Sequence, residues 1–154
     1  MAKALVADSS AAAGRAAAHL LEQLGFRVAC AAGAEEAMAL IAGTRPELVL
    51  ADGRLEKAGG GGLIEAIRRQ VWGDDLCLFH VTADGSASSI RRALDAGADD
   101  YIVKPYDEAL LRFKLMQART RGRLDTGRPK LRVVQDNSSA GDTSWRFRVY
   151  GRTA

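Results

Sequence analysis

Five short apolar runs alternate with helical patterns over the first 120 residues, and this alternation constrains the fold more than any other feature. The runs are nearly continuous in apolar residues, and they cover 3–7, 27–32, 47–51, 76–81 and 100–104. Strands of this kind belong to a sheet that is covered on both faces, as parallel sheets are. Helical spacing of apolar residues marks the segments 12–24, 35–42, 63–71, 88–96 and 107–119. Five strand–helix units predict an α/β domain with a doubly wound, five-stranded parallel sheet.

The charge distribution divides the chain into a body and a tail. Residues 1–118 carry 13 Lys and Arg against 16 Asp and Glu, whereas residues 119–154 carry nine against three. A basic stretch with two glycines and a proline follows the last helical pattern, and two short apolar segments follow it. We therefore expect one domain over 1–120, a basic linker over 121–130 and a C-terminal β-hairpin extension over 131–154.

Cysteine usage and the N-terminal residues indicate a cytoplasmic protein. Cys30 and Cys77 each lie within an apolar run, so we expect two buried thiols rather than a disulfide or a metal site. The first residues include a single lysine and no long apolar segment. We expect neither a signal peptide nor contact with a membrane.

Polar residues end four of the five predicted strands. Asp8 and Ser9 follow the first strand, Asp52 the third, Thr82 the fourth and Lys104 the fifth. Ligands of a doubly wound sheet bind at the carboxyl ends of its strands, so these side chains should converge on one shallow pocket. Two carboxylates suit Mg²⁺, and a lysine with a hydroxyl suits phosphoryl oxygens. A carboxylate nucleophile at Asp52 would form an acyl phosphate.

The segments LVADSS, PELVLAD, VTA and ALDAGADDYIVKPYD, in this order at the strand ends, resemble response-regulator receiver domains. The resemblance covers residues 3–118 and implies a flavodoxin-like sheet with strand order 2-1-3-4-5. It implies that Asp52 is the phosphoacceptor and that Lys104 pairs with the phosphoryl group. Thr82 would be the switch hydroxyl, and Tyr101 the aromatic residue that follows it.

The same resemblance implies a metal site with one unusual position. Asp8 and Asp52 would bind Mg²⁺ together with the backbone carbonyl of Arg54. Receivers usually carry a second acid where this chain has Ser9, so we expect Mg²⁺ to bind weakly. Glu56 could supply a replacement carboxylate, although a solvent-exposed loop glutamate is the simpler interpretation.

The resemblance predicts a two-component receiver that is no enzyme apart from phosphorylating and dephosphorylating its own aspartate. Its partners would be a histidine kinase or phosphotransfer protein and a downstream output protein, recognised by the fourth helix, fifth strand and fifth helix. Ser9 and the glycine-rich segment 59–62 leave a second interpretation open, a receiver-like binding module that does not depend on phosphorylation.

The tail suggests self-association rather than nucleic-acid binding. Trp145, Phe147 and Val149 alternate with polar residues, which predicts a strand with one apolar face. That face needs a covering surface, and we favour a homodimer. Binding of nucleic acid would have to use Arg119 to Arg132, and the acidic body makes it the less favoured hypothesis.

Overall fold

The computed structural model describes residues 1–56, 62–124, 130–134 and 146–150. The chain divides into two compact units, Met1–Leu124 and Asp125–Ala154. Within the described residues, no helix is long and apolar enough to cross a membrane.

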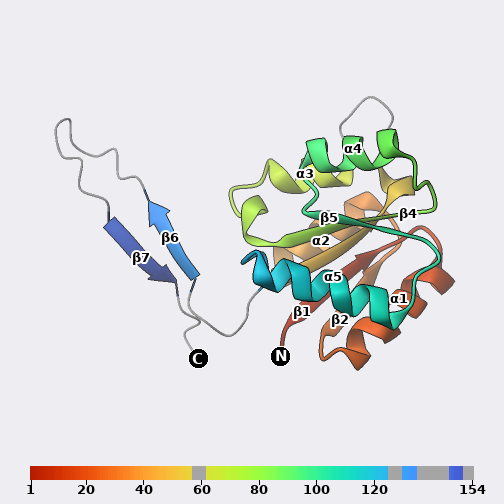
Figure 1. Ribbon diagram of the computed structural model, residues 1–154, viewed down its shortest axis with the longest axis horizontal. Helices are drawn as coiled ribbons and strands as arrows, with labels where there is room; N and C mark the ends of the chain where they lie inside the picture. The colour runs from red at the N-terminus through yellow and green to blue at the C-terminus, as the bar shows by residue number, and fades with distance from the viewer. Residues whose placement is uncertain (57–61, 125–129, 135–145, 151–154) are drawn as a thin grey trace. The chain divides into compact units, whose positions relative to one another are not determined.

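A five-stranded parallel sheet forms the centre of the first unit (Figure 1). Its strands are β1 (Lys3–Ala7), β2 (Arg27–Ala31), β3 (Leu48–Asp52), β4 (Cys77–Thr82) and β5 (Asp100–Val103). The hydrogen-bonded order is β2-β1-β3-β4-β5, and every neighbouring pair is parallel. The predicted fold class and strand order are confirmed.

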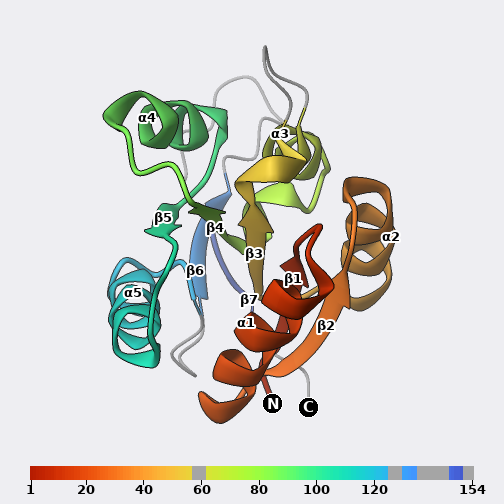
Figure 2. The same ribbon diagram turned by 90° about the vertical axis from the view of Figure 1, so that its right-hand side faces the viewer.

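Five helices cover the two faces of the sheet (Figure 2). They are α1 (Ala11–Gln23), α2 (Ala34–Thr44), α3 (Leu63–Arg68), α4 (Ala87–Ala96) and α5 (Glu108–Thr120). In β3, Leu48 and Leu50 pack with α1 and α5, whereas Val49 and Ala51 pack with α2, α3 and α4. All five residues of β3 are buried, which is why the sequence shows a continuous apolar run there.

The position of a strand in the sheet decides how deeply it is buried. Cys77 lies in β4, an inner strand, and burial raises the pKa of its thiol to about 12. The prediction that Cys30 is also buried is wrong, because Cys30 lies on β2 at the edge of the sheet and is exposed. An apolar run marks a strand but does not distinguish an edge strand from a central one.

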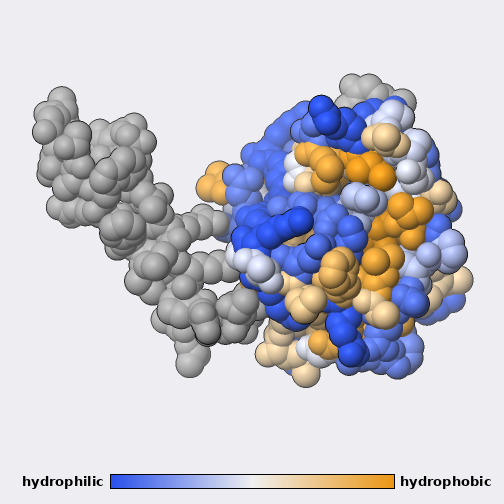
Figure 3. All heavy atoms as spheres, viewed as in Figure 1, coloured by the Kyte–Doolittle hydropathy of each residue, from blue (hydrophilic) through white to orange (hydrophobic). Residues whose placement is uncertain are grey.

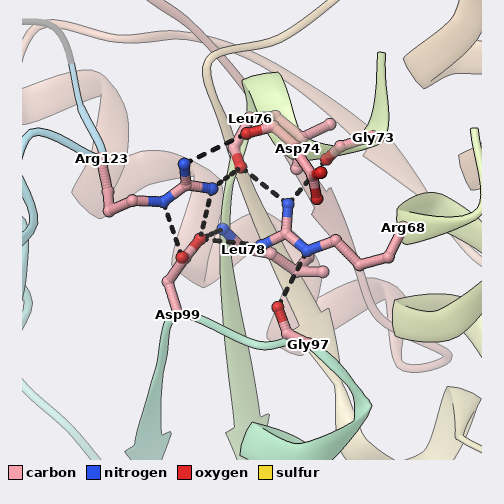
Figure 4. Close-up of polar contacts among 8 residues, drawn as sticks. All are labelled: Arg68, Gly73, Asp74, Leu76, Leu78, Gly97, Asp99 and Arg123. Carbon is pink, nitrogen blue, oxygen red and sulfur yellow. Dashed lines mark hydrogen bonds and ion pairs between the residues drawn. The ribbon is translucent and has the colours of Figure 1, made fainter. Parts of the chain in front are cut away.

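An ion-pair network closes the edge of the sheet at which β4 and β5 begin (Figure 4). The Asp99 carboxylate accepts hydrogen bonds from Arg68 at 2.9 Å, from Arg123 at 2.7 Å and from the Leu78 backbone N–H at 2.8 Å. Arg68 comes from α3, Arg123 from the turn after α5 and Leu78 from β4, so one carboxylate joins three parts of the chain.

Backbone carbonyl groups hold the two guanidinium groups of this network in place. Arg68 donates to the carbonyls of Gly73, Leu76 and Gly97 at 2.7, 3.0 and 2.8 Å, and Arg123 donates to that of Leu76 at 2.9 Å. The chain after α5 is therefore anchored to the domain, and the first unit extends beyond residue 120 to Leu124, which is buried.

Two further strands belong to the second unit. They are β6 (Lys130–Val134) and β7 (Arg146–Tyr150), and they pair antiparallel, with Leu131 opposite Val149. The connecting segment 135–145 lies outside the described residues, so the hairpin remains a prediction.

Replacing Asp99 with Ala should lower the free energy of unfolding by about 3 kcal/mol, because it leaves the buried Arg68 and the partly buried Arg123 without their shared counter-ion. The side chain of Arg68 is only 13% exposed. Urea unfolding followed by circular dichroism would measure the loss. As a control, Asp95→Ala removes the carboxylate of an exposed Arg91 pair on α4 and should cost less than about 0.5 kcal/mol. Equal losses in the two variants would contradict the structural role of the network.

Candidate functional site

The register of β1 and β3 places two carboxylates together at the carboxyl edge of the sheet. Ala7 pairs with Ala51, so Asp8, directly after β1, lies beside Asp52, the last residue of β3. Both aspartates are buried, with 6% and 4% of their surface exposed. Two neighbouring buried carboxylates repel each other unless cations neutralise them.

Lys104 supplies one cation from the end of β5. Its Nζ lies 2.8 Å from Asp8 Oδ2 and 3.5 Å from Asp52 Oδ1. Its backbone N–H donates to the Thr82 carbonyl at 2.7 Å, which fixes the residue against β4. The peptide bond between Lys104 and Pro105 is cis. Asp8, Asp52 and Lys104 therefore converge as the sequence predicted.

Arg54 supplies a second cation that the sequence analysis did not anticipate. It lies in the short 3₁₀ helix η1 (Gly53–Leu55), directly after β3. Its Nε donates to Asp52 Oδ2 at 2.8 Å, and its Nη2 donates to Asp8 Oδ1 at 2.9 Å. The resemblance to receivers assigns a role only to the backbone carbonyl of this residue, whereas its guanidinium group bridges both carboxylates.

These contacts favour the charged forms of Asp8 and Arg54. Burial by itself would raise the pKa of Asp8, but the hydrogen bond and charge of Lys104, the Ser10 backbone N–H and the charge of Arg54 together lower it. The hydrogen bond and charge of Asp52, with a smaller contribution from Asp8, raise the pKa of Arg54. Two carboxylates and two basic side chains therefore contact one another in the site.

Thr82 lies next to this cluster, beside Gly53, which follows Asp52. Thr82 is buried, and its Oγ1 accepts a hydrogen bond from the Asp84 backbone N–H at 3.0 Å. A Cβ atom added to Gly53 would lie 3.3 Å from Thr82 Oγ1 and 3.1 Å from His80 Cε1. The backbone of Gly53 is therefore packed closely against two side chains of β4.

His80 of β4 is a buried neighbour of this cluster. Its imidazole is 5% exposed, and its Nδ1 has no hydrogen-bond partner among the described residues. Burial lowers the pKa of His80, and the charge of Asp52 opposes this effect only in part. The two-residue period of β4, which places His80 on the same face as Thr82, could have indicated this position.

The other predicted site residues lie around the cluster. Tyr101 is half-buried on β5, and the Lys114 ammonium lies 4.3 Å from the centre of its ring. Ser9 is exposed. Glu56 accepts a hydrogen bond from the Ile64 backbone N–H at 2.9 Å in the first turn of α3, and burial raises its pKa.

The donor set only partly suits a magnesium ion. The Asp8 and Asp52 carboxylates are hard oxygen ligands of the type that Mg²⁺ prefers. Within the described part of the chain, however, no three His, Cys, Asp or Glu side chains are grouped closely enough to hold a metal. The space between the two carboxylates is bridged by Arg54.

A cavity of about 490 Å³ adjoins the cluster on the side of α1. Asp8, Asp52 and Lys104 line its polar part, and Ala13 and Ala17 of α1 line its apolar part. The small side chains of α1 thus leave space next to the Asp52 carboxylate.

A doubly wound parallel sheet with two carboxylates and a lysine at its carboxyl edge agrees with the class of receiver-like signalling domains. The family model described as "Response regulator receiver domain" matches residues 4–116. The chain therefore belongs to the response-regulator receiver family. Members take part in two-component phosphorelays and are not enzymes beyond the chemistry of their own phosphorylation.

Individual relatives agree with this assignment. Response regulator MprA of Mycolicibacterium vanbaalenii is 36% identical over 118 residues, which cover 75% of this chain and 50% of the relative. The chain spans about half the length of the curated relatives it matches.

Solved structures agree as well. The chemotaxis protein CheY4 of Vibrio cholerae is 25% identical with a TM-score of 0.68, covering 76% of this chain and 98% of that one. The CheX–CheY–BeF₃–Mg²⁺ complex from Borrelia burgdorferi shares the fold at 22% identity and a TM-score of 0.68, covering 77% and 89%. That complex contains Mg²⁺.

The buried His80 predicts a loss of stability in mild acid. Because burial lowers its pKa in the folded state, the unfolded chain binds a proton that the folded chain excludes. The stability that the neutral, buried imidazole allows is complete above 6.5, the ordinary pKa of histidine. This stability is lost as the pH falls from there through the folded-state pKa of His80. Urea unfolding at several pH values should show a smaller pH dependence for His80→Leu than for the wild type.

A matched control is His19→Gln, which replaces an exposed histidine of α1 and leaves His80 in place. It should keep the pH dependence of the wild type. If His80→Leu and the wild type lose stability in parallel between pH 7 and 5, the imidazole is not responsible.

Proposed function

We propose that Asp52 accepts a phosphoryl group from a histidine kinase or phosphotransfer protein and that the phosphorylated domain binds a downstream output protein. The observation that supports this most directly is the Lys104 ammonium, 2.8 Å from Asp8 and 3.5 Å from Asp52 at the carboxyl edge of the sheet. Because the donor and the output protein would be cytoplasmic, we propose the same location for this chain.

In the transfer step, an Asp52 carboxylate oxygen forms a bond to phosphorus as the bond from phosphorus to the donor histidine nitrogen breaks. Lys104 is close enough to neutralise the incoming phosphoryl oxygens. Thr82 would turn its hydroxyl from the Asp84 N–H toward the phosphoryl group, and Tyr101 would move inward beside it. Of the predicted metal ligands, we propose that Asp8, Asp52 and the Arg54 carbonyl bind Mg²⁺ weakly. Neither Ser9 nor the helix-capping Glu56 adds a second strong ligand.

The surface of α4, β5 and α5 is the proposed binding site for the output protein. Hydrophobic side chains lie among hydrophilic ones on the face that these elements share (Figure 3). Leu94 of α4 and Leu110, Phe113 and Met116 of α5 are exposed. An inward movement of half-buried Tyr101 on β5 would alter this surface, which is how the chemistry at Asp52 would reach a partner.

Replacing Asp52 with Asn should abolish incorporation of phosphate from acetyl phosphate, because the amide is not a nucleophile for this reaction. Intact-protein mass spectrometry would measure the added mass. Asp95→Asn, on exposed α4, is the matched control and should be labelled like the wild type. Labelling of Asp52→Asn at the wild-type rate would refute the proposal. A wild type that takes up no phosphate would favour the phosphorylation-independent binding module.

We also propose that the 131–154 segment forms a hairpin that mediates a homodimer, with the receiver domain preceding it. The antiparallel register, which sets Leu131 opposite Val149 and Val133 opposite Phe147, supports a shared apolar face. An isolated two-stranded hairpin is marginal in water, so such a face needs a partner surface. Trp145 of the predicted face lies outside the described residues.

Deleting residues 125–154 should convert a dimer into a folded monomer. The deletion keeps Arg123 and Leu124, which belong to the first unit, so the receiver should retain its stability. Light scattering coupled to size-exclusion chromatography measures the mass, and circular dichroism checks the fold. A full-length chain that is monomeric at high concentration would contradict the proposal.

A further inference from the structure

The guanidinium group of Arg54 occupies the position between the two carboxylates of the site. One nitrogen contacts Asp52 at 2.8 Å and another contacts Asp8 at 2.9 Å. A planar guanidinium presents several N–H groups in a fixed fork, so a single side chain can join two carboxylates at once. A divalent cation held by these two carboxylates would compete with this guanidinium group for them.

The charges of the described cluster balance without a metal ion. Asp8 and Asp52 contribute two negative charges, and Arg54 and Lys104 contribute two positive ones. A second acid at position 9 would leave this cluster with a net negative charge, whereas Ser9 adds none. The neutral residue at position 9 and the bridging arginine are therefore electrostatically consistent with each other.

Arg54 is also free to exchange its partners. Its side chain is 59% exposed, whereas those of the two aspartates are 5% exposed. It lies in the one-turn helix η1 at the surface, so its guanidinium can turn away without unpacking the core. Arginine binds phosphate oxygens through two parallel hydrogen bonds, so the same group can follow the charge onto a phosphorylated Asp52.

We infer that the Arg54 guanidinium takes the electrostatic place of the divalent cation, so that Asp52 is phosphorylated without Mg²⁺ and Mg²⁺ binds only by displacing Arg54. The displacement of Arg54 by Mg²⁺ concerns the unphosphorylated protein, whereas phosphorylation without Mg²⁺ rests on the proposed function. With acetyl phosphate, an Asp52 oxygen bonds to phosphorus while the phosphorus–oxygen bond to acetate breaks. Acetate leaves with the electron pair, and no other reactant is needed.

Calorimetric titration of the full chain with Mg²⁺ tests the displacement. Arg54→Gln should bind Mg²⁺ about tenfold more tightly than the wild type, because a competing charge next to the carboxylates is gone. Arg69→Gln removes an exposed arginine of the Glu65 pair, and its affinity should stay within about twofold, since distant surface charges are screened. An unchanged affinity in Arg54→Gln would overturn the inference.

Two more variants separate charge from geometry. Arg54→Lys keeps the positive charge but loses the fork, so its Mg²⁺ affinity should lie between those of the wild type and Arg54→Gln. Ser9→Asp in the Arg54→Gln background restores a second acid and should tighten Mg²⁺ binding further. If Arg54→Lys binds Mg²⁺ as tightly as Arg54→Gln, the positive charge does not exclude the metal and the inference fails.

Labelling by acetyl phosphate in excess EDTA tests whether Asp52 is phosphorylated without Mg²⁺. The wild-type rate should stay within about threefold of its rate in Mg²⁺, whereas Arg54→Gln should lose about tenfold in EDTA and recover in Mg²⁺. A wild type that is labelled only with Mg²⁺ would overturn the metal-independent step. A wild type that is labelled in neither condition would refute the proposed function, and the calorimetric result would still decide whether Arg54 excludes the metal.

Discussion

Repulsion between two buried carboxylates is the constraint on which the arrangement of the site depends. The parallel register of β1 and β3 brings Asp8 beside Asp52, and both are removed from water. Two like charges in such a place require counter-charges in contact with them. Lys104 provides one from the end of β5 and Arg54 provides the other from η1. The loops after three strands are thus tied together by the need to neutralise a single pair of charges.

The opposite edge of the same sheet uses similar residues for a different purpose. There, Asp99 is shared by Arg68 and Arg123, whose guanidinium groups also donate to backbone carbonyls. Arg68 is 13% exposed, whereas Arg54 is 59% exposed and its hydrogen bonds at the site go to carboxylates. A buried arginine fixed by carbonyl groups serves as scaffold. An exposed arginine that contacts carboxylates can exchange them for another anion, as the proposed phosphorylation of Asp52 would require.

Much of the fold and part of the site could be predicted because both follow from local patterns. Continuous apolar runs mark covered parallel strands, and polar residues at the ends of such strands must meet at one edge. Asp8, Asp52 and Lys104 could be predicted in this way. The same reasoning failed for Cys30, because an apolar run does not reveal that its strand lies at the edge of the sheet.

The sequence by itself determined the α/β class, the sequence of strands and helices, and the identity of the residues that end the strands. Only the tertiary structure decided which atoms neutralise which charges, because side-chain contacts depend on the register of strands that are distant in sequence. An arginine two residues after Asp52 has no predictable direction in the sequence. In the folded chain, its guanidinium group lies between Asp8 and Asp52 because their carboxylates are the nearest negative charges.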